Sequence, residues 1–304
     1  MRQIFSLTTL LFSTFLFGQD VNFNQVNLTN IYSNPALTGV NGQQKISAAF
    51  RNQWPGLSGN LGSVFISYQN GQNKFGNIGA YAMNTSFAGS FNSTRAGLNY
   101  AFPISITEDL TITPGLSGSV INDRIDFSKI TFGDIANPRI GALYDITDPQ
   151  SLKENTLSAD FSGGLLVTYK NFFLGTSFNQ WGSIGLQSVF NTYTNFGASF
   201  NLLDNDLVLI PEISYSTLSG FQRMEFKVSS QYKWAKLGLE YASRDGFSFV
   251  TGAQIGQFEA LFSSEMIISP LTNNFFNAYE LGISFNIKGS KSQDTKPTYQ
   301  YSLF

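Results

Sequence analysis

The feature that most constrains this chain is an alternation of polar and apolar residues with a period of two. A strand turns successive side chains to opposite faces, so such a segment has one apolar and one polar face. Helical spacing does not appear with comparable strength anywhere in the sequence. The alternation is clearest in residues 221–234: the polar positions include Arg223, Glu225, Lys227, Ser229 and Gln231, and the apolar positions include Met224, Phe226, Val228, Tyr232 and Trp234.

About fourteen segments of this kind follow one another along the chain. Each segment with its connection takes about 20 residues, which suits the strands of about 10 residues in an outer-membrane β-barrel. The sequence therefore predicts an all-β fold, a transmembrane barrel of about 14 antiparallel strands. The expected strands are residues 43–52, 60–69, 75–84, 90–102, 110–121, 156–169, 172–179, 190–202, 206–216, 221–234, 236–243, 246–256, 257–267 and 276–287.

The connections between these segments alternate in length. Short turns on one side and long loops on the other are typical of outer-membrane barrels, whose two chain ends lie on the short-turn, periplasmic side. The short connections are residues 70–74, 103–109, 170–171, 204–206, 234–236 and 256–257, and the long ones are 53–59, 121–156, 180–189 and 268–275.

The composition agrees with a surface that does not face water on every side. Charged residues make up 12% of the chain and aromatic residues 15%, whereas soluble domains carry about 25% charged residues. Aromatic residues at strand ends beside the short turns predict a belt at the lipid headgroups. A soluble β-sandwich with these rings in its core is the alternative, but its strands are usually shorter. The expected belt comprises Tyr68, Tyr100, Phe102, Tyr169, Phe172, Phe173, Tyr232 and Trp234.

The chain contains no His and no Cys, and its net charge is −2. These counts exclude an imidazole base, a thiolate nucleophile, disulfides and Cys/His zinc sites. No run of Lys or Arg suggests a nucleic-acid partner. Pairs of acidic residues lie in expected turns, and the pair Asp204 and Asp206 lacks the Gly and Glu of an EF-hand calcium loop. We expect a protein that is not an enzyme, with no catalytic residues, no cofactor and no metal.

Four regions follow from these patterns. Residues 1–18 are predicted to be a cleaved signal peptide, with Arg2 before an apolar stretch that is too short to span a bilayer. Residues 19–42 are expected to be a periplasmic or plug segment, residues 43–287 the barrel, and residues 288–304 a polar periplasmic tail. An exported barrel of this kind belongs in the outer membrane of a Gram-negative bacterium.

Polar faces of the expected strands should line the barrel lumen. A barrel of about fourteen strands is too wide for side chains alone to fill. Water, the N-terminal segment, an inward loop or a partner must therefore occupy the lumen, and the sequence leaves this choice open. The charged residues expected there are Arg51, Arg95, Glu212, Arg223, Glu225 and Lys227.

The last expected strand resembles the terminal signal by which outer-membrane barrels are recognised for insertion. Glu280 is followed two residues later by Gly282, and then by Phe285 and Ile287 in alternation. We expect these four residues to form the insertion signal.

Two motifs near the N-terminus carry a family resemblance. The first contains Asn34-Pro35-Ala36 and Gly39, and the second contains Arg51, Gln53 and Trp54. Together they resemble the PorP/SprF family of type IX secretion membrane proteins of Bacteroidetes. The resemblance extends over most of the chain but departs from the family pattern at residues 59–61, which read Gly-Asn-Leu in place of Gly-Ala-Pro.

The resemblance implies an outer-membrane component of type IX secretion or gliding motility. Its expected partners are membrane lipid, the C-terminal domain of a large, adhesin-like exported protein, and periplasmic ring or peptidoglycan-linked components. A solute-conducting porin and a secreted soluble β-rich binding protein are the alternatives. The Asn34-Pro35 pair predicts a non-helical turn, and Arg51 with Gln53 is expected to hold the N-terminal segment by hydrogen bonds. The motif either locks that segment or contacts the partner.

Overall fold

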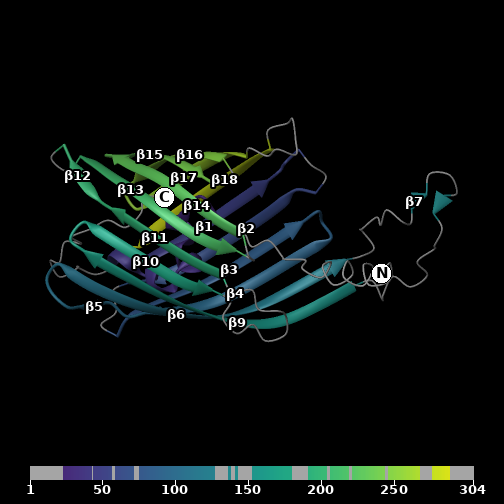
Figure 1. Cartoon of the computed structure of the whole chain (residues 1–304), viewed down its shortest axis with the longest axis horizontal. Coiled ribbons are helices and arrows are strands. Elements are labelled where there is room, and N and C mark those ends of the chain that lie inside the picture. The colour runs from purple at the N-terminus through teal and green to yellow at the C-terminus, as the bar shows by residue number, and fades with distance from the viewer. Residues whose placement is uncertain are drawn as a thin grey trace, which may run out of the picture.

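The long strands of the chain form a closed antiparallel β-barrel in the computed structural model (Figure 1). In the described part of the chain, no helix is long and apolar enough to cross a membrane. The predicted signal peptide and tail lie outside the described residues, and so do Asp145, Asp148 and Asp204 of the acidic pairs that the sequence places in turns. The structure describes residues 23–42, 44–56, 59–71, 75–126, 136–137, 141–142, 153–179, 191–203, 206–218, 221–243, 246–267 and 276–287.

Each long strand pairs with the next one along the chain, and β1 pairs with β18 to close the sheet. Short strands β5 (Ile104–Ser105) and β12 (Phe200–Leu202) extend the wall, and β7 (Ala136–Asn137) pairs with β8 (Gly141–Ala142) outside it. The long strands are β1 (Gln44–Gln53), β2 (Leu61–Asn70), β3 (Asn77–Phe87), β4 (Phe91–Ala101), β6 (Leu110–Asp126), β9 (Lys153–Tyr169), β10 (Phe172–Asn179), β11 (Asn191–Ala198), β13 (Leu207–Leu218), β14 (Phe221–Tyr232), β15 (Ala235–Ala242), β16 (Gly246–Ile255), β17 (Phe258–Ile267) and β18 (Phe276–Ile287).

The predicted barrel of about fourteen strands is confirmed, and most strand bounds differ by one or two residues from those expected. The largest differences are in β6, which continues to Asp126, and in β9, which begins at Lys153. The segment expected at residues 190–202 is divided at Ser199, whose N–H donates to the carbonyl of Asn171 at 2.8 Å. That bond directs the backbone of Ser199 away from the strand ladder and separates β11 from β12.

Side-chain exposure is inverted relative to a soluble protein. On β1, the charged residues Lys45 and Arg51 are buried, whereas Ile46 and Phe50 are 44% and 45% exposed. The same arrangement recurs around the barrel, so the apolar faces point outward and the polar faces inward. An outer face of this kind is stable in lipid and costly in water, which argues against the soluble alternatives.

One expected member of the aromatic belt does not lie there. Phe172 is 46% exposed on the outer face, but Phe173 is 1% exposed and points into the barrel. Adjacent residues of a strand face opposite sides, so both rings cannot reach lipid. The expectation for Phe173 was wrong for this reason, while Tyr169, Tyr232 and Trp234 are exposed as expected.

The strand pairing fixes the tilt of the barrel. A path that starts at Glu154 on β9 can be followed from each residue to its direct partner on the next strand, first to β6 and last to β10. After one circuit of the sheet this path returns to β9 at Thr168. The register therefore shifts by 168 − 154 = 14 residues per circuit. A shift of one residue per strand tilts the strands by roughly 35° from the barrel axis.

The inverted exposure predicts the effect of a charge on the outer face. Leu239 lies in the middle of β15 and is 64% exposed. Leu239→Arg is expected to lower the free energy of unfolding in lipid vesicles by about 2–4 kcal/mol, since the guanidinium would be placed in hydrocarbon. Ser105→Arg, at an exposed polar position beside a short turn, is the control and should change little. Equal losses for the two variants would contradict the assignment of the outer face to lipid.

Candidate functional site

The N-terminal residues lie inside the barrel. Residues 23–42, which we call the plug, comprise α2 (Val26–Ser33), η1 (Pro35–Leu37) and η2 (Val40–Gly42). The plug hydrogen-bonds side chains on well-separated parts of the wall, including Ser248 on β16, Asn99 on β4 and Asn179 on β10. Of the occupants that the sequence left open, the structure therefore places the N-terminal segment in the lumen.

Asn34 and Pro35 turn the chain between α2 and η1. Asn34 has extended backbone angles, as expected for a residue before proline, and this ends α2. Its side-chain Oδ1 accepts the N–H of Ala36 at 2.9 Å, and its Nδ2 donates to the carbonyl of Thr176 on β10 at 3.2 Å. Asn34 thus caps η1 and attaches it to the wall at the same time.

Glycine residues on the wall make room for this turn. Gly115 on β6 and Gly164 on β9 are paired directly across the two strands. A Cβ atom on Gly115 would collide with the backbone of Ala36, and one on Gly164 would collide with Oδ1 of Asn34. The plug can approach the wall this closely only where the wall has no side chain.

Polar side chains of the wall, most of them amides or hydroxyls, donate hydrogen bonds to the carbonyl groups of the plug. A backbone buried in a lumen must find such partners, because unpaired buried carbonyls are costly. The donors are Asn99 to Ile31 at 2.6 Å, Ser177 to Ser33 at 2.6 Å, Asn179 to Ser33 at 3.0 Å, Asn77 to Thr38 at 3.0 Å and Lys45 to Asn27 at 2.9 Å.

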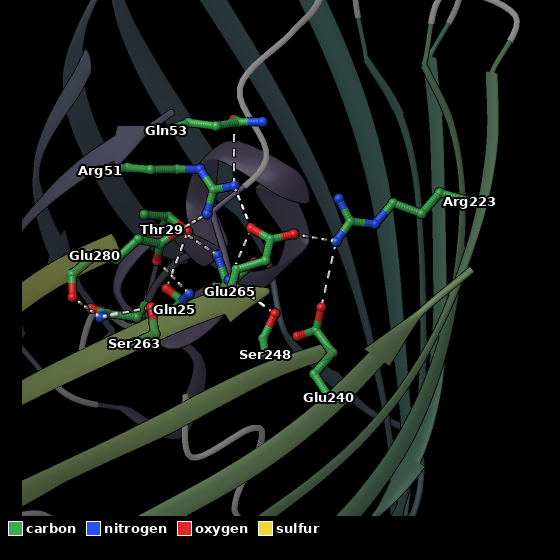
Figure 2. Close-up of polar contacts among 11 residues, drawn as sticks. Gln25, Thr29, Arg51, Gln53, Arg223, Glu240, Ser248, Ser263, Glu265 and Glu280 are labelled. Atoms are coloured by element: carbon green, nitrogen blue, oxygen red, sulfur yellow. Dashed lines mark hydrogen bonds and ion pairs between the residues drawn. The ribbon is translucent and has the colours of Figure 1, made fainter. Parts of the chain in front are cut away.

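A buried ionic cluster holds the beginning of the plug (Figure 2). Arg51 on β1 binds Glu280 on β18 at 2.6 Å and Glu265 on β17 at 2.5 Å. Arg51 and Glu280 face each other across the seam between the first and last strands. The carboxylate of Glu280 accepts the backbone N–H of Asn24 at 2.8 Å and that of Gln25 at 3.1 Å. Glu280 therefore places a negative charge at the start of α2, where a helix favours it.

The carboxylate of Glu280 links Arg51 to the plug. Arg51 and Gln53 were both expected to hydrogen-bond to the plug; in the structure, Gln53 accepts from Arg51 at 3.5 Å. Beyond Glu265 lies Arg223, 3.9 Å away, which also contacts Glu240 at 3.5 Å (Figure 2). The cluster thus continues from the plug to the inner face of β14 and β15.

An apolar cluster packs the plug at the opposite, short-turn half of the barrel. Leu28 and Leu37 of the plug are completely buried, together with inward-facing residues of five strands. Burying these apolar side chains against one another stabilises the contact between plug and wall. The wall residues of the cluster are Leu166, Phe173, Ile210, Val250 and Leu261.

The remaining predicted site residues lie at the ends of the motifs. Gly39 has a left-handed φ of 61°, and a Cβ there would collide with Gly71. Trp54 follows the end of β1 with a φ of 59°. These two residues shape the chain where it leaves the plug and where it leaves β1.

The residues of the expected insertion signal divide between the two faces of β18. Glu280 and Gly282 face the lumen, and a Cβ on Gly282 would collide with Gln25 and Leu28 of the plug. Phe285 packs against Phe258 of β17 with ring centroids 4.7 Å apart and the ring planes tilted by 48°, and Ile287 pairs with Gln44. Glu280 and Gly282 therefore have contacts in the folded barrel, and recognition for insertion stays a prediction.

Several wall residues that the plug requires were not among the predicted site residues. Gly115, Gly164 and Asn99 belong to expected strands, but nothing in a strand pattern shows which inward residues meet a plug. Glu265 occupies an inward position two residues before the end of β17.

Comparison with known proteins identifies the family. The sequence model described as "Type IX secretion system membrane protein PorP/SprF" matches residues 16–285. The chain belongs to the PorP/SprF family. It is therefore an outer-membrane barrel of type IX secretion, as the motifs indicated. No curated protein matches the chain.

Solved structures similar to this PorP/SprF protein are outer-membrane barrels. The Pseudomonas putida toluene transporter TodX has a TM-score of 0.53 at 11% identity, covering 89% of this chain and 95% of its own. The CymD monoaromatic hydrocarbon channel has a TM-score of 0.52 at 11% identity, covering 90% and 95%. Acinetobacter baumannii Omp33 has a TM-score of 0.50 at 10% identity, covering 81% and 98%. At these identities the likeness shows the fold alone.

Two adjacent glycines test the contact between plug and wall. Gly164 faces the plug, whereas Gly163 faces outward and its added Cβ would have Leu116 at 4.0 Å as neighbour. Gly164→Ala is expected to lower the free energy of unfolding by about 1–3 kcal/mol, because the methyl group displaces Asn34. Gly163→Ala is the matched control and should cost less than about 1 kcal/mol. Denaturant unfolding in detergent would measure both, and equal costs would contradict the close approach.

Glu280→Gln tests the ionic anchor, the name we give to the contacts of Glu280 with Arg51, Asn24 and Gln25. The amide removes the charge opposite Arg51 and one acceptor for the N–H groups of Asn24 and Gln25. The plug is then expected to be held less firmly, and planar-bilayer recordings should show more frequent ion-conducting openings than for the unaltered protein. Glu108→Gln, in an exposed turn, is the control. Unchanged recordings for Glu280→Gln would argue that the anchor is not needed to keep the lumen closed.

Proposed function

We propose that this PorP/SprF protein is a non-enzymatic partner barrel for one large, adhesin-like exported protein. It binds the C-terminal domain of that protein in the outer membrane during type IX export and anchors it at the cell surface. The family assignment supports the connection with type IX secretion. Gliding motility would follow if the exported partner is a motility adhesin.

The attachment of the plug to the inner wall is the observation that carries this proposal. The plug is held by Glu280 at one end, by Asn34 in its middle and by Leu37 in an apolar cluster. A barrel whose interior is occupied by its own chain is better suited to present surfaces to a partner than to conduct solutes. The partner would then dock on the loops and strand ends at the long-loop rim.

The solute-conducting porin is the alternative function. The toluene transporter TodX and the CymD channel share the fold, and their names describe transport. In this chain, however, Leu28 and Leu37 of the plug pack against inward-facing apolar residues of the wall in the short-turn half of the lumen, which favours the partner role over conduction. Steady conductance by the unaltered protein would favour the porin.

The buried residues of the family motif make their contacts inside the barrel. Asn34, Ala36 and Arg51 are all buried and bonded to other parts of the same chain. These contacts favour the role of locking the plug over direct contact with a partner. Periplasmic ring or peptidoglycan-linked components would meet the short-turn rim instead.

A deletion experiment tests the partner role. In the strain that lacks this protein, the exported partner is expected to disappear from the cell surface, as measured by surface proteolysis or antibody labelling. Pull-down of the tagged barrel should recover the same large exported protein. Re-expression of the unaltered gene should restore display, and normal display in the deletion strain would refute the proposal.

A further inference from the structure

A group of polar side chains lies on the outer face of the barrel, at the long-loop end of the neighbouring strands β3, β4, β6 and β9 (Figure 1). The amide of Asn84 on β3 donates to Thr94 at 2.8 Å and to Asn92 at 3.1 Å, both on β4. On β6, Asn122 lies directly opposite Thr94. Arg124, two residues further along β6, lies directly opposite Asn92. We call this group the outer polar patch, and it comprises Asn84, Asn92, Thr94, Asn122, Arg124 and Asn155.

The patch lies across the membrane from the aromatic belt of the short-turn side. Asn122 pairs with Leu157 on β9, which lies 169 − 157 = 12 residues from Tyr169 in that belt. Twelve residues of a strand tilted by roughly 35° span about 32 Å along the barrel axis. The apolar band of an outer-membrane barrel is about 25 Å tall, and a headgroup layer follows it on each side. The patch therefore lies at the headgroup layer of the leaflet that faces the cell surface.

The patch is continuous with the lipid-facing surface. Val64 on β2, directly opposite Asn84, is 44% exposed. Val120 on β6, two residues nearer the membrane than Asn122, is 51% exposed. Polar groups inside hydrocarbon are costly, so the contact with acyl chains ends where the amides begin. The same face of the wall thus passes from acyl chains to headgroups, which makes lipid the neighbour of the patch.

Arg124 gives the patch a positive charge. Its side chain is exposed, and amides flank it on both neighbouring strands, Asn92 on β4 and Asn155 on β9. The next outward position carries Asp126 on β6 and, directly opposite, Lys153 on β9, so it adds no net charge. A guanidinium can bind a phosphate through two parallel N–H bonds, and amides can bind sugar hydroxyl groups. The patch therefore suits a headgroup that combines phosphate with sugar.

Lipid of this chemistry is present at that height. In the outer membrane of a Gram-negative bacterium, the leaflet that faces the cell surface consists largely of lipopolysaccharide, whose headgroup sugars carry phosphates. An arginine just beyond the apolar band keeps its charged end among such headgroups while its stem lies along the wall. Basic residues at a membrane surface attract anionic headgroups, so the charge of Arg124 and the charge of this leaflet are complementary.

We propose that the outer polar patch binds the phosphorylated sugar headgroup of lipopolysaccharide. Arg124 receives a phosphate of that headgroup, and the amides beside it bind the sugar. The inference goes beyond the proposed function and does not depend on it, because it concerns the lipid-facing wall and holds whichever protein partners the barrel. A lipid bound there would fix this side of the barrel at the leaflet that faces the cell surface.

Binding of fluorescently labelled lipopolysaccharide to the purified barrel in detergent tests the proposal, with the affinity measured by fluorescence anisotropy. Arg124→Gln is expected to weaken binding about tenfold, because it removes a charge-assisted contact with phosphate. Arg124→Lys keeps the charge but loses the paired N–H groups, so its affinity should fall between the two. Removal of the phosphates from the lipid with a phosphatase should abolish the difference between Arg124→Gln and the unaltered protein.

Lys233→Gln is the matched control, because it removes an exposed charge at the short-turn end. It should leave the affinity unchanged, and heat-modifiable migration on gels verifies that all variants are folded. Equal affinities for Arg124→Gln and the unaltered protein would overturn the lipid site. Full displacement of the lipid by inorganic phosphate would also overturn it, since the patch would then be a site for a free anion. If Arg124→Gln leaves lipid binding intact but lowers recovery of the exported protein in the pull-down, the patch belongs to that partner instead.

Discussion

The structure depends on the absence of hydrogen-bonding groups in the membrane interior. Every strand inside lipid must find its partners in the protein, so the sheet has to close upon itself. Closure is achieved where β1 pairs with β18, and the outward residues are then free to be apolar. The same closure encloses a lumen that is too wide for the inward side chains to fill. The plug follows from that constraint.

The plug places a different demand on the wall. Its two 3₁₀ turns and one short helix leave carbonyl and N–H groups that no regular ladder satisfies. Asn99, Ser177 and Asn77 supply donors, and Glu280 supplies the acceptor at the start of α2. Polar residues of the inner wall therefore serve a particular chain segment as hydrogen-bond partners. The apolar cluster around Leu28 adds packing between plug and wall in the short-turn half.

The strands could be predicted from the sequence because the period of two is a local property. The pattern in residues 221–234 predicts β14, whose bounds are Phe221–Tyr232. The family motif indicated Asn34 of the plug and Arg51 of β1. The wall residues that meet them could not be predicted, because the contact of Gly164 with Asn34 joins residues that are 130 positions apart in the chain. Which inward residues meet the plug depends on the barrel register, and no single strand encodes it. The division at Ser199 was missed for a similar reason, since its partner Asn171 lies on another turn.

The position of the ionic anchor at the seam links the plug to the order in which the polypeptide is made. Arg51 belongs to the first strand and Glu280 to the last, so the acceptor that holds Asn24 is synthesised long after the plug itself. A polypeptide that stops before β18 lacks the wall closure and the plug acceptor together. A truncated product can therefore neither close the sheet nor hold the start of the plug, so completion of the wall and anchoring of the plug both depend on the last strand to be made.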